Sequence, residues 1–141
     1  MLTAHALHLL TLPDRYGAPL AEYYYAAEDS LLYVRWHGQL TAAEVIRGLQ
    51  QGAQWRGQLS FQRILNDKLD SGGDWSDALP WLQYEWLPQA VAVGVRAMAY
   101  VLSDDLEGRI VSGEFVEAAQ EHLNVALFSD LNSAQRWLLT Q

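Results

Sequence analysis

The feature that most constrains the fold is Val95–Leu102, a nearly continuous apolar run interrupted only by Arg96. A strand exposed on one face alternates apolar and polar residues, whereas a continuous apolar run is typical of a central strand covered on both faces. Strands of that kind lie in parallel sheets, whose neighbours are joined by helical crossovers. We therefore expect an α/β domain with a parallel sheet.

The flanking segments supply strands and helices in alternation. Leu31–His37 alternates along one face and forms a hairpin with Glu22–Ala27. Thr41 and Glu44 have the spacing of a capping box, which starts a helix. The other expected elements are a strand at 62–67, a polar loop at 67–77, a helix capped by Ser76 and bent or ended by Pro88, a strand at 95–102, a helix from Asp104 or Asp105, a buried strand at 125–128 and a helix capped by Asp130. This order predicts a mixed sheet of about five to six strands, with an N-terminal antiparallel hairpin, later strands parallel, and about four helices.

Length and charge narrow the class of protein. The 141 residues fit one domain over 1–141, with 1–20 as an N-terminal arm or extra strand. The net charge is −8 and the arginines are scattered, so we expect neither nucleic acid nor an anionic membrane as a partner. No apolar run approaches the roughly 18 residues of a spanning helix, and we expect a soluble, cytoplasmic protein.

The sequence contains no recognisable catalytic or metal-binding motif. It has no cysteine, and its histidines lack ligand spacing; they are His5, His8, His37 and His122. The carboxylates from Asp67 to Asp77 do not match a calcium-binding loop, and no nucleophile, base and oxyanion donor can be assembled around them. We therefore expect no enzyme activity, no catalytic residues, no metal and no cofactor.

Several segments over roughly residues 22–141 resemble the STAS family (sulfate transporter and anti-sigma-factor antagonist domains), particularly its SpoIIAA-like branch of small stand-alone bacterial proteins. The matching segments are Trp36-His37-Gly38, the Thr41 helix, Arg63–Asp67, Ala97–Val101, and Leu127–Asp130 leading into Ala134–Leu138. The resemblance implies a non-enzymatic regulatory module. The partner that the resemblance implies is a protein such as a kinase that is also an anti-sigma factor. A second copy of the chain is the alternative, because Tyr23, Tyr24 and Tyr25 alternate across a strand and their non-core face suits dimer contacts.

The resemblance also implies a phosphorylation switch. In the family the phosphoacceptor is the second serine of an Asp-Ser-Ser-Gly type motif, and Asp70-Ser71-Gly72-Gly73 has a glycine at that position. The candidate phosphoacceptors are Ser71, which matches the first, non-acceptor serine of the motif, and Ser76, which matches the acceptor by its distance from the strand. The alternative for both serines is ordinary turn and capping chemistry.

Six tryptophans are unusual in a chain of this size. Trp36, Trp86 and Trp137 share faces with aliphatic residues and are expected in the core. The candidate partner or ligand surface consists of Asp70, Asp74, Trp75, Trp81 and Tyr84. A second hypothesis is a small-ligand or lipid-binding domain that uses an apolar, tryptophan-rich cleft.

Overall fold

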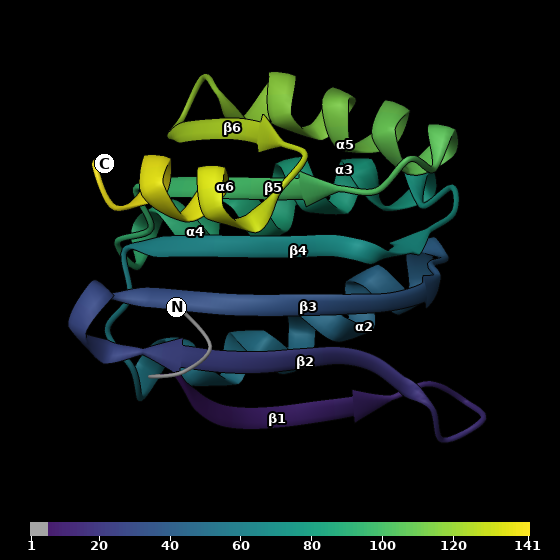
Figure 1. Cartoon of the computed structure of the whole chain (residues 1–141), viewed down its shortest axis with the longest axis horizontal. Coiled ribbons are helices and arrows are strands. Elements are labelled where there is room, and N and C mark those ends of the chain that lie inside the picture. Colours follow the sequence, from purple (N-terminus) through teal and green to yellow (C-terminus); the bar gives the residue numbers. More distant parts are fainter. Residues whose placement is uncertain (1–5) are drawn as a thin grey trace.

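In the computed structural model, which describes residues 6–141, six strands form one sheet in the order of the sequence (Figure 1). The strands are β1 (Leu7–Pro13), β2 (Pro19–Ala26), β3 (Leu31–Gln39), β4 (Arg63–Gly72), β5 (Ala97–Leu102) and β6 (Asn124–Phe128). β1, β2 and β3 are antiparallel, and β3 to β6 are parallel. The predicted α/β class and mixed sheet are confirmed, and β1 is the extra strand within the N-terminal arm.

Helices cover the two faces of the sheet unequally. One face carries α2 (Ala42–Ala53), the helical segment 76–92 and α5 (Leu106–Ala119), whereas α6 (Leu131–Leu138) covers only β4 to β6 on the other face (Figure 1). Short 3-10 turns lie at η1 (Ala27–Asp29) and η2 (Gln54–Gly57). The larger core therefore lies between the sheet and the three-helix layer. On the opposite face, no helix among residues 6–141 covers the half formed by β2 and β3.

Local capping signals start the helices. Thr41 forms the predicted capping box with Glu44, and Asp105 and Asp130 accept the backbone N–H of Gly108 and Ser133. Such caps satisfy amides that the helix itself leaves unpaired. They account for the agreement between the sequence and the starts of α2, α5 and α6.

Strand β4 differs from the prediction. It continues to Gly72 rather than ending at Asp67, because Ser71 and Gly72 pair with the end of β3. The predicted loop is therefore reduced to a short turn. Ser76 does not cap the next helix; it is the first helical residue, after the N-cap Trp75, and its N–H donates to Oδ1 of Asp74 at 2.9 Å.

The helical segment 76–92 contains η3 (Ser76–Ala78), α3 (Leu79–Trp81), the π-helical turn η4 (Leu82–Trp86) and α4 (Leu87–Ala92). Pro88 does not end it. Because Pro88 has no N–H for the carbonyl four residues earlier, the preceding turn widens, and Leu87 N–H donates to the Leu82 carbonyl. A π-helical turn of this kind is frequent at functional sites.

Strand β6 is not the buried strand that the sequence predicts. It forms an edge of the sheet, and Leu127 is 42% exposed. No helix in the described part of the chain is long and apolar enough to cross a membrane. Of the four histidines, His5 lies outside the described residues.

Candidate functional site

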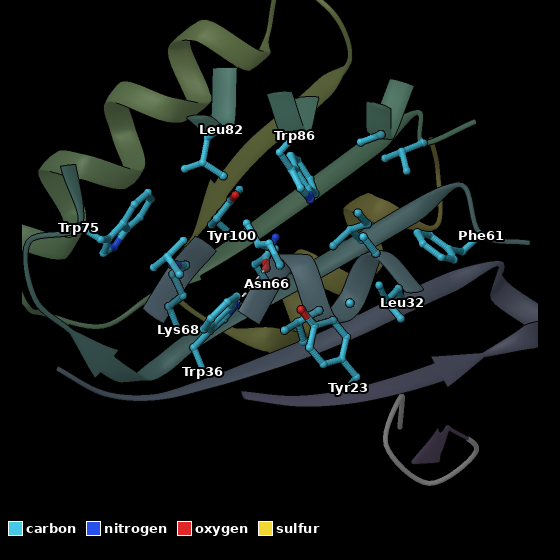
Figure 2. A pocket seen from close by; sticks show the side chains of 18 residues that line it. Tyr23, Leu32, Trp36, Phe61, Asn66, Lys68, Trp75, Leu82, Trp86 and Tyr100 are labelled. Carbon is cyan, nitrogen blue, oxygen red and sulfur yellow. Dashed lines mark hydrogen bonds between the residues drawn. The ribbon is translucent and has the colours of Figure 1, made fainter. Parts of the chain in front are cut away.

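A cavity lies between the sheet and the three-helix layer (Figure 2). Aromatic side chains form much of its wall: Tyr23, Trp36, Phe61, Trp75, Trp86 and Tyr100. The free space among the lining side chains is about 600 Å³ with its mouth included, and about 30 Å³ can hold the centre of a water-sized molecule. Because a bound water needs roughly 10–15 Å³, the cavity admits a molecule of a few non-hydrogen atoms.

Strand β4 places a lysine in this apolar wall. Alternation along the strand directs Ile64, Asn66 and Lys68 to the cavity. Lys68 is 6% exposed and lies between Trp36 and Trp75, with Tyr100 beyond (Figure 2). Its Nζ is 4.2 Å from the ring centroid of Trp75, 5.2 Å from that of Trp36 and 5.8 Å from that of Tyr100.

The amine of Lys68 makes no hydrogen bond or ion pair within the described residues. Burial lowers the pKa of Lys68 to about 7, because the apolar surroundings disfavour the ammonium form. The faces of the three rings partly offset that cost, since they attract a cation. The amine is therefore available in its neutral form near neutral pH.

Two further polar side chains line the same cavity. Asn66 Oδ1 accepts a hydrogen bond from Trp36 Nε1 at 3.2 Å, which fixes the amide beside the lysine. Burial raises the pKa of Tyr100, so its phenol stays protonated. Asn66, Lys68 and Tyr100 thus combine a fixed amide, a neutral amine and a phenol on one apolar wall.

The uncovered half of the opposite face carries a separate polar cluster. His37 Nε2 lies 2.5 Å from Glu22 Oε2, and Arg35 pairs with Asp70 at 2.5 Å. Tyr33 Oη donates to Asp67 Oδ2. These side chains are paired with one another, whereas the amine of Lys68 contacts only aromatic rings among the described residues.

The structure separates the residues that the sequence assigns to one surface. Trp75 is buried, with 2% of its surface exposed, and its side chain points into the cavity. Gly73, with φ of +99°, turns the chain inward just before it. Trp81 is partly buried against the same core. Asp70, Asp74 and Tyr84 are exposed, and Ser71 and Ser76 are half-buried.

Sequence reasoning missed Lys68, Asn66 and Tyr100. The available signal was the alternation Ile64, Asn66, Lys68 continuing a strand, together with the fact that Lys68 is the only lysine among 141 residues. The general exposure of lysine argued the other way.

Comparisons of the chain with protein-family models, curated proteins and solved structures gave no match. Within residues 6–141, no group of three or more His, Asp or Glu side chains is placed to hold a metal ion.

Proposed function

We propose that this chain binds a small molecule, with one polar group and a short apolar part, in the aromatic cavity. The observation that carries this proposal is the buried amine of Lys68, which faces the cavity and makes no hydrogen bond to any residue that the structure describes. Burying a polar group in that way costs roughly 1–3 kcal/mol. An apolar side chain at this position would avoid that cost, and a buried titratable group in a cavity is typical of a functional site.

The lining defines the ligand chemistry. The polar group would be a carboxylate or a carbonyl, since either can accept a hydrogen bond from the amine of Lys68. The apolar part would contact the rings of Trp36, Trp75 and Trp86. With about 30 Å³ accessible, against roughly 10–15 Å³ for one water, we expect the ligand to be among the smallest carboxylates and carbonyl compounds.

The proposal is tested by titrating the protein with propionate and acetone while recording the indole N–H signals in ¹H–¹⁵N NMR spectra. We expect saturable shifts of the signals of Trp36, Trp75 and Trp86. The signal of Trp137, which packs on Phe128 across the sheet, should stay in place. Equal small shifts at all indoles, or none, would refute the proposal.

Two variants define the role of the charge. Lys68→Met should weaken propionate binding at pH 6 by at least tenfold, because it removes the cation that faces the carboxylate. Arg35→Met, which removes an exposed cation from the opposite face, is the matched control and should bind propionate as the wild type does. If all three proteins bound propionate with equal affinity, the binding would not depend on Lys68.

A second candidate function is the STAS-like regulatory module, acting in the cytoplasm on a kinase-like protein or on a second copy of the chain. It is favoured by Tyr84, a large aromatic side chain that is 76% exposed, because exposed aromatic residues are enriched at interfaces. Asp70 and Asp74 are exposed as well. Ser71 and Ser76 remain the proposed phosphoacceptors.

This second function is tested by native mass spectrometry of the protein isolated from its own host, together with Tyr84→Ala. We expect the wild type to carry a protein partner or a phosphate on Ser71 or Ser76, and Tyr84→Ala to lose the partner. An unmodified monomer in both samples would count against the regulatory module and would leave the cavity proposal unaffected.

A further inference from the structure

We propose that Lys68 is a covalent attachment site for short-chain aldehydes, which it holds as an imine inside the aromatic cavity. The inference rests on the proposed function, since it names the ligand class and the bond that forms. A neutral amine next to space for a small carbonyl compound is the arrangement that imine formation requires. A lysine in an apolar pocket meets that requirement because burial favours its unprotonated form.

The surroundings of Lys68 contain nothing that would hold it as an ammonium ion through a counter-ion. The cavity receives Tyr23 from β2 and Tyr100 from β5, and a smaller cavity on the other side of Lys68 receives Arg109 from α5. Neither cavity is lined by an aspartate or glutamate within the described residues. Burial is therefore the cause of the lowered pKa of Lys68.

The proposed step is balanced by the groups present. The nitrogen lone pair of Lys68 forms a bond to the carbonyl carbon, and the π pair of the carbonyl takes up a proton released by the nitrogen, which gives a carbinolamine. The hydroxyl then leaves as water with a proton from the phenol of Tyr100. The nitrogen forms the C=N bond and returns its remaining proton to the phenolate, so the products are an imine and one water molecule.

Tyr100 is assigned as the proton donor from its position and its surroundings. Its ring centroid is 5.8 Å from Lys68 Nζ, it lines the same cavity, and its hydroxyl makes no hydrogen bond within the described residues. Burial raises the pKa of Tyr100 and makes its phenol a weaker acid. The phenol can still give its proton to the departing hydroxyl, because water is a weaker acid than a phenol.

The experiment uses acetaldehyde with sodium cyanoborohydride, followed by peptide mapping of the ethyl group. Lys68 is the single lysine in the sequence, so a labelled lysine identifies the site without ambiguity. At pH 7 we expect labelling of Lys68 to be about tenfold to a thousandfold faster in the folded protein than in urea, where the lysine has its ordinary pKa. Benzaldehyde, which exceeds the cavity, should show no such acceleration.

Two variants sharpen this test. Lys68→Arg should lose the lysine label while keeping the cationic side chain. Tyr100→Phe should slow the labelling at least tenfold, whereas Arg35→Met, which removes an exposed cation on the opposite face, should be labelled at the wild-type rate. Unchanged labelling in Tyr100→Phe would remove the proton-donor role of Tyr100.

The outcomes distinguish this inference from the proposed function. Labelling of folded Lys68 no faster than in urea overturns the imine, and if propionate still shifts the cavity indoles, the binding function stands alone. If neither propionate nor acetone shifts these signals and the labelling is not accelerated, both proposals fail. Accelerated labelling with acetaldehyde but not with benzaldehyde supports both.

Discussion

Lys68 places an ionisable amine in the core, and its burial lowers the stability of the fold. The pKa of Lys68 is lowered by burial from 10.5 to about 7. Between these two pH values the unfolded chain binds more protons than the folded protein, so stability rises with pH across this window. Below about pH 7 the full cost of charging a buried amine is present.

Lys68→Met is therefore expected to increase the free energy of unfolding at pH 7 by roughly 2–5 kcal/mol, since it fills the same space without an ionisable group. The gain should shrink as the pH rises toward 10, where the wild-type amine is neutral in both states. Urea unfolding at pH 7, 8.5 and 10 measures the difference. A gain that does not change with pH would contradict the buried-amine explanation, and Arg35→Met is the control for loss of a positive charge.

On the opposite face, the carboxylate of Asp67 is buried and depends on hydrogen bonds from its neighbours. Asp67 is 3% exposed, and its two oxygens accept the Tyr33 hydroxyl and the backbone N–H of Leu69. Tyr33→Phe leaves one carboxylate oxygen buried without a partner, so we expect a loss of about 1–3 kcal/mol in the free energy of unfolding. Tyr24→Phe, which removes a half-buried hydroxyl bonded to Glu22 at 2.9 Å, should cost less in the same denaturation assay. If Tyr33→Phe and Tyr24→Phe lost the same free energy of unfolding, burial of the hydrogen bond would not explain the loss.

At the scale of the element, α2 approaches the sheet closely enough to form one wall of the cavity. A Cβ built on Gly48 would lie 2.7 Å from the Trp36 ring, and one on Gly52 would lie 2.5 Å from the Tyr23 ring and hydroxyl. Tyr23 Oη also donates to the Gly48 carbonyl at 2.6 Å. The glycines thus allow the helix to contact two of the cavity's aromatic side chains directly.

Gly48→Ala is expected to lower the free energy of unfolding by about 1–3 kcal/mol, because the new methyl group would displace Trp36. It should also shift the Trp36 indole signal and weaken propionate binding. Gly113→Ala in α5 is the matched control, since nothing lies within 4 Å of its Cβ position, and it should gain about 0.5–1 kcal/mol from helix propensity. A stabilising effect of Gly48→Ala would contradict the close approach of α2.

The elements that could be predicted from sequence are those specified by neighbouring residues. The capping box of Thr41 and Glu44 and the apolar run of β5 are local signals, and both are confirmed. The extension of β4 was not predictable in this way, because Ser71 and Gly72 read as a turn and become strand only through pairing with Gly38 and Gln39. The candidate site depends on that extension, since it orders the chain between Lys68 and Trp75.

At the scale of the whole molecule, the unequal covering of the two faces separates the cavity from α6. Arg63, at the start of the central strand β4, holds α6 in place: Nε donates to the Leu138 carbonyl at 3.1 Å and Nη2 to the Gln141 carbonyl at 2.9 Å. Nη1 donates to the Asp29 carbonyl at 2.6 Å. A guanidinium at the last carbonyls of a helix satisfies groups that the helix leaves unpaired and offsets its dipole.

Arg63→Met should therefore loosen α6 without changing the cavity. We expect a loss of roughly 1.5–3 kcal/mol in the free energy of unfolding, because hydrogen bonds from a charged group are removed from a half-buried site. Amide hydrogen exchange should become faster in α6, whereas α2 should keep its place in the order of exchange rates among the helices, as expected when elements open separately. Arg136→Met, which removes an exposed cation from α6 itself, should change stability by less than about 0.5 kcal/mol. Propionate binding and acetaldehyde labelling of Lys68 should match the wild type in both variants, because α6 and the cavity lie on opposite faces of the sheet. If Arg63→Met lost either the binding or the labelling, the two faces would be coupled through β4.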